Sequence, residues 1–282
     1  MKTGPKADKP AESRVAKVEG KKLHYLIAGQ GPALILLHGY TQTSRMWRPL
    51  IEKLKDKFTV IAPDLPGIGD SDIPKSADMK TAAIRIHALA KSLGVAEARV
   101  VGHDIGLMVA YAYAAQFPTE VKKLVVMDAF LPGVVGWELA YNNDNLWHFR
   151  FHGPTPEALV KGREKIYFAY FWNDLAADKK RSLTAADRNA YVAAYSRPGR
   201  MRAGWAYFAA WPDTANDFAQ MAKTKLTMPV LSIAGEKASA AILGPQMKLV
   251  ATTVTAVDLK DTGHWLMEER PQETMEAVIA FL

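Results

Sequence analysis

Short apolar runs that alternate with helical patterns are the feature that most limits how this chain can fold. Residues 32–38 and 58–63 are apolar runs that begin or end next to Gly or Pro, and each is too short to form a core helix. Similar runs recur at 99–102, 121–128, 228–234 and 253–259, and helical patterns occur at 47–54, 81–93, 107–116 and 272–282. This alternation predicts an α/β fold with a mostly parallel, doubly wound sheet and an early hairpin at 14–28.

The alternation stops between residues 131 and 224, where aromatic residues are frequent and the pattern is helical without strands. We therefore expect a helical cap domain at 131–224, inserted into an α/β core domain that combines residues 22–130 and 225–282. Residues 1–21 are predicted to be a flexible N-terminal segment, because the start of the chain is polar and lacks the apolar stretch of a signal peptide. As given, the sequence predicts a cytoplasmic protein, or a periplasmic or secreted one if a signal peptide was removed.

Composition narrows the partners and cofactors. The formal charge of +7 comes from scattered Lys and Arg residues, so we expect neither a nucleic acid nor a membrane partner. The chain has no cysteine, which excludes disulfides, thiolate catalysis and cysteine-ligated metals. The seven histidines show no metal-ligand spacing, so neither a metal nor an organic cofactor is expected. The expected partner is a small-molecule substrate, and a homodimer is an assembly that the sequence allows.

The segment Gly102-His103-Asp104-Ile105-Gly106 follows an apolar strand candidate and runs directly into a helical pattern. A G-x-x-x-G segment in this place is typical of a sharp strand-to-helix turn that exposes its central residue as a nucleophile. Small flanking residues let the backbone pack closely, and the helix N-terminus favours negative charge. The alternative interpretation is that Asp104 merely caps the helix.

Four motifs together resemble a known family: HGYTQT at 38–43, DLPGIGDSD at 64–72, GHDIG at 102–106 and TGHWLMEERP at 262–271. The set is similar to the epoxide hydrolase and dehalogenase branch of the α/β-hydrolase superfamily, from about residue 22 onward. The resemblance implies an α/β-hydrolase fold in which Asp104 attacks the substrate and forms a covalent alkyl-enzyme ester. It also implies that His264 activates the hydrolytic water, and that backbone N–H groups of Tyr40 and Ile105 form the oxyanion hole.

The acid that orients His264 has two candidates, each following a strand candidate. Asp128 ends the run 121–128, and Glu236 follows the run 228–234. Many relatives carry Asp two residues beyond the position of Glu236, where this chain has Ala238. We therefore expect Asp128 to be the orienting acid and keep Glu236 as the alternative.

The choice between an epoxide and a halide depends on the cap. Trp147-His148-Phe149 resembles the Trp-His-Phe of Cif-like bacterial epoxide hydrolases, in which a His and a cap Tyr polarise the epoxide oxygen. His148 matches that His, whereas the strict position of the Tyr is Phe208, and Tyr207 lies one residue earlier. Either Tyr207 is presented to the substrate by a shifted helix, or His148 works with another donor. His38, Trp147 and Phe208 are expected to line the substrate pocket.

The sequence thus predicts an epoxide hydrolase with an Asp-His-Asp triad. A haloalkane or haloacid dehalogenase is the alternative, although Ile105 stands where haloalkane dehalogenases carry Trp, and the Arg residues typical of fluoroacetate dehalogenases are missing after Asp104. A binding module without turnover is the alternative from another class, and the intact triad argues against it. An ordinary esterase is disfavoured because the turn carries no Ser.

Overall fold

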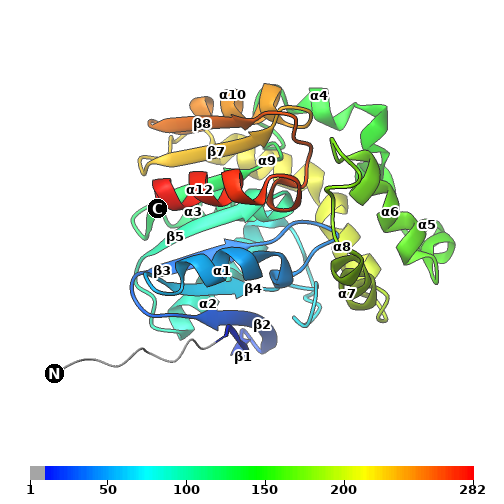
Figure 1. The fold of residues 1–282 in the computed structure, drawn as a ribbon, viewed down its shortest axis with the longest axis horizontal. Coiled ribbons are helices and arrows are strands. Elements are labelled where there is room, and N and C mark those ends of the chain that lie inside the picture. Colours follow the sequence, from blue (N-terminus) through cyan, green and yellow to red (C-terminus); the bar gives the residue numbers. More distant parts are fainter. Residues whose placement is uncertain (1–9) are drawn as a thin grey trace.

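The structure is a computed structural model and is described for residues 10–282. The protein is built on one eight-stranded sheet (Figure 1). The order across the sheet is β1-β2-β4-β3-β5-β6-β7-β8. The β1–β2 and β2–β4 pairs are antiparallel, and the other neighbouring pairs are parallel, which confirms the predicted sheet. The strands are β1 (Glu12–Val18), β2 (Lys21–Ala28), β3 (Ala33–Leu37), β4 (Thr59–Pro63), β5 (Ala98–His103), β6 (Val121–Met127), β7 (Val230–Gly235) and β8 (Val254–Leu259).

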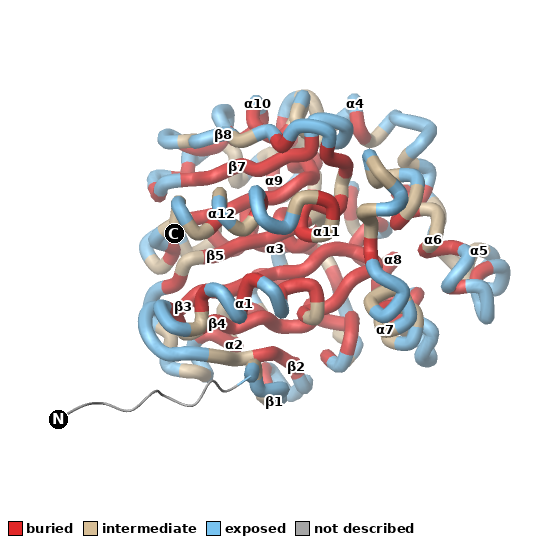
Figure 2. The backbone as a smooth tube through the Cα atoms, viewed as in Figure 1, coloured by how far each residue is buried: buried red, intermediate tan, exposed pale blue. Residues whose placement is uncertain are grey.

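Helices cover both faces of the sheet because the central strands are apolar on both sides. In β3, Leu34 and Leu36 pack into a core with α1 (Arg48–Leu54) and α12 (Pro271–Phe281). Ile35 and Leu37 face the opposite core, which also contains side chains of α2 (Met79–Ser92), α3 (Ile105–Gln116) and α10 (Ala240–Val250). Figure 2 shows the central strands, from β4 to β7 across the sheet, as a largely buried layer between helices whose outer sides are exposed. Two short helices, η1 (Ser44–Trp47) and α11 (Leu266–Glu269), complete the loops after β3 and β8.

Between β6 and β7 the chain forms helices, apart from an isolated bridge at Leu226. This stretch contains the region predicted to be the cap, and α5 to α8 lie beyond one end of the sheet (Figure 1). Aromatic side chains on these helices pack against one another and against the loop that carries Tyr40. The helices are α4 (Trp137–Tyr141), η2 (Asp144–Arg150), α5 (Pro154–Val160), α6 (Glu164–Asp174), α7 (Ala185–Tyr195), α8 (Arg200–Ala209) and α9 (Trp211–Met221).

The prediction of a flexible segment at 1–21 is wrong for residues 12–21. Residues 12–18 form β1, which pairs with β2 from Glu12↔Ile27 to Val18↔Lys21. The pairing stabilises a polar strand at the sheet edge, because backbone hydrogen bonds and the buried Val18 hold it against β2. Residues 1–9 of the predicted segment lie outside the described residues.

Candidate active site

Asp104 lies at the turn between β5 and α3, with φ 54° and ψ −125°. Residues with side chains rarely occupy this region, so the surrounding structure must hold the strained turn. A Cβ on Gly102 would lie 2.2 Å from the Gly106 carbonyl oxygen, and one on Gly106 would lie 2.3 Å from the Leu37 carbonyl oxygen. Both positions therefore require glycine, and the turn presents the Asp104 side chain beyond the end of the sheet.

The Asp104 carboxylate accepts hydrogen bonds from two backbone N–H groups. The Tyr40 nitrogen is 2.6 Å from Oδ1, and the Ile105 N–H also bonds the carboxylate. Burial raises the pKa of Asp104 above its usual value, against the opposing effects of the His264 charge and these two N–H groups. The structure thus brings Asp104 together with the two backbone N–H groups that the sequence analysis assigned to the same site.

His264 stands between two carboxylates. Its Nδ1 is 2.7 Å from Asp128 Oδ2, and its Nε2 is 3.7 Å from Asp104 Oδ2. Burial lowers the pKa of His264, but the hydrogen bond and charge of Asp128, followed by the charge of Asp104, outweigh burial and raise it above the usual value. An imidazole held in this way by an acid on Nδ1 can accept a proton at Nε2.

Asp128 follows β6 and is fixed by donors from the end of β7 and from the residue before α10. Its Oδ1 accepts hydrogen bonds from the Gly235 N–H and from both the N–H and the hydroxyl of Ser239. The alternative acid, Glu236, is exposed, and its carboxylate accepts the Asp261 N–H instead of contacting His264. Of the two acids considered from the sequence, Asp128 is therefore the one that contacts His264.

Two residues that the sequence did not single out hold the His264 loop. His103 is buried and its Nε2 is 2.9 Å from the His264 carbonyl oxygen, while burial lowers its pKa to about 3. The Glu269 carboxylate accepts N–H groups of Gly263 and Trp265 in the loop and of Ala177 in the cap. Glu269 lies within the motif TGHWLMEERP, and this position in the motif was the feature of the sequence that could have identified it.

A cavity of about 590 Å³ opens over the carboxylate of Asp104 and reaches His264. His148 lies in its wall, is buried, and has no hydrogen-bond partner at Nδ1 among the described residues. Burial, and then the charge of His264, lower the pKa of His148 to about 3, so the imidazole is neutral. Other lining residues come from the helical stretch between β6 and β7 and from the core helices α3 and α10: Met108, Phe130, Leu139, Leu146, Phe149, Tyr170, Trp211 and Ile242.

Comparison with known proteins identifies the family of this fold. The profile of the alpha/beta hydrolase fold family matches residues 32–271. The chain belongs to the α/β-hydrolase fold family. A soluble epoxide hydrolase from Corynebacterium sp. (strain C12) is 32% identical over 274 residues, covering 94% of this chain and 95% of that protein.

Solved structures of other proteins superpose on nearly the whole length of this chain. Cfl2 from Burkholderia cenocepacia superposes with a TM-score of 0.89 at 32% identity, over 98% of this chain and 97% of that chain. The epoxide hydrolase CorEH superposes with a TM-score of 0.87 at 31% identity, over 96% and 98% of the two chains. The Cif epoxide hydrolase from Acinetobacter nosocomialis has a TM-score of 0.83 at 25% identity, over 97% and 90%. This chain is thus an α/β-hydrolase enzyme that is similar to epoxide hydrolases.

Four side chains that were expected around the substrate lie elsewhere in this α/β hydrolase. Tyr207 is fully buried, and its hydroxyl donates to the Pro66 carbonyl oxygen at 2.9 Å, because its position on α8 points it to the core loop. Phe208 lies behind the cavity wall, with its ring centroid 4.8 Å from Tyr40 and 5.5 Å from His148. Trp147 is 36% exposed and packs on Tyr170. None of them lines the cavity.

His38 is the fourth of these residues, and both of its ring nitrogens are already bonded. Nδ1 pairs with the Gly39 carbonyl oxygen, and Nε2 accepts the Leu65 N–H at 2.9 Å. Burial lowers the pKa of His38, which agrees with a neutral ring that joins two loops. Its role in the structure is to fix the loop that carries Tyr40, and it does not line the cavity.

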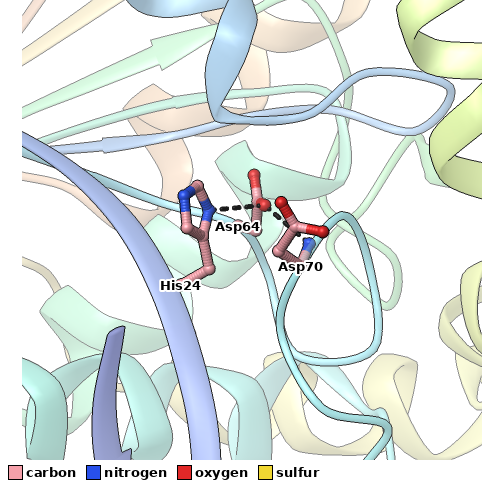
Figure 3. Close-up of side chains that lie close together, drawn as sticks. All are labelled: His24, Asp64 and Asp70. Carbon is pink, nitrogen blue, oxygen red and sulfur yellow. Dashed lines mark hydrogen bonds and ion pairs between the residues drawn. The ribbon is translucent and has the colours of Figure 1, made fainter. Parts of the chain in front are cut away.

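One group within residues 10–282 brings a His and two carboxylates together, away from Asp104 (Figure 3). His24 Nδ1 is 2.8 Å from Asp64 Oδ2, and the two Asp64 oxygens also accept the N–H groups of Ser44 and Asp70. Asp70 itself pairs with Arg197. These internal contacts use the atoms that a metal would need, so the group is a structural support for the loop after β4.

No helix among the described residues is both long and apolar enough to cross a bilayer.

Proposed function

We propose that this α/β hydrolase opens epoxides to vicinal diols through a covalent ester on Asp104. The observation that carries the proposal is the division of the Asp104 carboxylate between two environments. Oδ1 faces the Tyr40 N–H, and Oδ2 faces His264 beside the cavity. Such an arrangement suits a nucleophile whose ester carbonyl remains in an oxyanion hole. The similarity to epoxide hydrolases supports the same reaction.

In the first step, Asp104 Oδ2 forms a bond to an epoxide carbon as the carbon–oxygen bond of the ring breaks. The leaving oxygen remains in the substrate as an alkoxide, which takes a proton from solvent water. The neutral His148 in the cavity wall donates an N–H hydrogen bond to this oxygen as its charge develops.

In the second step, His264 Nε2 takes a proton from water, and the resulting hydroxide attacks Cγ of Asp104. The carbonyl oxygen becomes an oxyanion, which is stabilised by the N–H groups of Tyr40 and Ile105. Asp128 stabilises the imidazolium through Nδ1. Collapse of the intermediate breaks the Cγ–Oδ2 bond, and Oδ2, which leaves as part of the product, takes the proton from His264. The diol leaves, and the new carboxylic acid of Asp104 gives its proton to the hydroxide that the first step left in solvent, which restores the carboxylate.

The test is a trapping experiment with His264→Gln, which removes the base of the second step and leaves the nucleophile. After incubation with a panel of aryl and alkyl epoxides, intact-mass and peptide mass spectrometry are expected to show one substrate mass added to the Asp104 peptide. The matched control is His264→Gln combined with Asp104→Asn, which is expected to remain unlabelled.

Product assays on the wild-type enzyme separate the alternatives. Diol formation without an adduct in His264→Gln would contradict the covalent mechanism. Halide release from haloacids or haloalkanes, with no turnover of any epoxide, would favour the dehalogenase. Binding without any turnover or adduct would favour the binding module.

A further inference from the structure

The loop that carries Tyr40 and the loop that carries His264 are joined by a pair of side chains, Gln42 and Glu268. Gln42 is fully buried, two residues after Tyr40, and Glu268 lies in α11, four residues after His264. Gln42 Nε2 donates to Glu268 Oε1 at 2.8 Å. The pair thus connects the oxyanion donor to the proposed base at a point outside the cavity lining.

The remaining two oxygens of the pair have no partner. Gln42 Oε1 and Glu268 Oε2 are both inaccessible to solvent, and neither receives a hydrogen bond from any described residue. An amide oxygen and an ionised carboxylate oxygen are both acceptors, and a buried acceptor without a donor is destabilising. One proton on Glu268 Oε2 removes the problem at both atoms, because a carboxylic acid and an amide can form a cyclic pair with two hydrogen bonds.

The surroundings also favour the acid form of Glu268. Burial raises its pKa to about 8, and the charges of Asp187 and Glu269 act in the same direction, against the charge of His264 and the N–H of Glu268 itself. The groups that face it are Asp187 and Tyr191 from α7 and His264 and Glu269 from its own loop. Arg45, the nearby cation of η1, is paired with Asp187 at 2.8 Å.

We propose that Glu268 is a carboxylic acid at neutral pH, and that its cyclic pair with Gln42 positions the Tyr40 loop against the His264 loop. Glu268 is a positioning residue, and its effect on turnover rests on the proposed function. When Glu268 ionises, the hydrogen bond from Oε2 to Gln42 is lost and a negative charge is added near His264. The loss of this hydrogen bond between the two loops is expected to reduce turnover once Glu268 has lost its proton.

The protonation state can be measured without any substrate. In protein labelled with ¹³C at the glutamate side-chain carboxyl, the resonance lost in Glu268→Gln identifies Glu268. We expect it to remain protonated at pH 6 to 7 and to titrate near pH 8. The exposed Glu236, identified in the same way with Glu236→Gln, serves as the matched control. Titration of Glu268 in the ordinary range of a glutamate, about pH 4 to 5, would overturn the proposal, whether or not the protein hydrolyses epoxides.

The positioning role is tested by three variants. Gln42→Leu breaks the pair and is expected to lower kcat about tenfold with less than a twofold change in KM. Glu268→Gln can form an amide–amide pair at every pH, so it is expected to keep kcat at pH 7 and to lose the alkaline decline. The exchange Gln42→Glu with Glu268→Gln restores an acid–amide pair and is expected to recover most of the activity lost in Gln42→Leu.

The outcomes of these variants separate this proposal from the proposed function. A Gln42→Leu enzyme with the wild-type kcat and pH profile would refute the positioning role. An alkaline decline that persists in Glu268→Gln would refute the assignment of that decline to Glu268. If no variant turns over an epoxide, the proposed function fails, and the carboxyl titration still decides the protonation of Glu268.

Discussion

Replacing Asp128 with Asn should separate the two chemical steps, because the change reaches His264 without touching Asp104. The asparagine oxygen can keep the hydrogen bonds from Gly235 and Ser239, since Asp128 Oδ1 accepts them. Its NH₂ group then faces His264 Nδ1, where Asp128 Oδ2 lies at 2.7 Å. His264 must accept a hydrogen bond at Nδ1, so its proton moves to Nε2, the nitrogen that has to take a proton from water.

The size of the effect follows from the contact that is lost. Two unit charges 2.7 Å apart interact by about 6 kcal/mol at an effective dielectric constant of about 20. Each 1.36 kcal/mol corresponds to about a tenfold change in rate. The imidazolium forms only during ester hydrolysis, so that step should slow by roughly 10⁴-fold, as for the same change in a Ser-His-Asp triad. The attack of Asp104 on the substrate does not use this charge and should be much less affected.

The assay is rapid-quench measurement of diol combined with intact-mass spectrometry of the enzyme. Asp128→Asn is expected to give one equivalent of covalent ester, followed by very slow diol release. Glu236→Gln is the matched control, because Glu236 is exposed and bonds the Asp261 N–H, so its turnover should equal that of the wild type. If Asp128→Asn turns over within tenfold of the wild type, or if Glu236→Gln shows the defect instead, the assignment of Asp128 is refuted.

Three further predictions test other parts of the site. His148→Phe removes the N–H donor from the cavity wall and should slow formation of the ester by roughly 10²-fold or more. Single-turnover kinetics in an Asp128→Asn background would measure this rate, and an unchanged rate would exclude His148 as the donor to the epoxide oxygen. Tyr207→Phe removes the bond to the Pro66 carbonyl oxygen and should cost about 1 kcal/mol in the free energy of unfolding with kcat unchanged, so a large loss of kcat would restore the catalytic role first expected for Tyr207. His264 must be neutral to activate water, and its pKa is raised above 6.5, so the rate of ester hydrolysis should decline as the pH falls through a value above 6.5. Mass spectrometry should then find the ester accumulating in the wild type at about pH 5.5, below the ordinary pKa of a histidine. A rate of ester hydrolysis that stays constant down to that pH would contradict this prediction.

The sequence predicted the core and the grouping of Asp104, Asp128 and His264 because local chemistry determines them. Gly102 and Gly106 are required by backbone atoms within 2.3 Å of where a Cβ would lie, so the turn leaves a clear pattern in the sequence. Asp128 and His264 each follow a parallel strand candidate, and the carboxyl ends of parallel strands meet at one edge of the sheet. The order of strands and motifs along the chain is therefore enough to place these residues near Asp104.

The cap side chains could not be placed in the same way. Tyr207 and Phe208 are neighbours on α8 and lie about 100° apart around its axis, so the rotation of α8 decides where each side chain points, and neither lines the cavity. That rotation depends on how α8 packs against Tyr40 and the loop at Pro66, which are distant in sequence. Glu269 was missed for a similar reason, because its four N–H donors come from its own loop and from residues 177 and 178 of the cap.

The three carboxyl groups around His264 differ mainly in how many donors each one receives. Asp128 accepts hydrogen bonds from Gly235, from two groups of Ser239 and from His264. Asp104 accepts two N–H groups and faces His264 at 3.7 Å, whereas Glu268 accepts the Gln42 amide at Oε1 and receives no donor at Oε2 from the described residues. Environments that hold neighbouring carboxyl groups in different protonation states define acid and base roles at one site. Glu268 is the one of these three carboxyl groups with a buried oxygen that no described residue bonds, so it is the one that retains a proton, and it can stabilise the loops without competing with Asp104 for the imidazolium of His264.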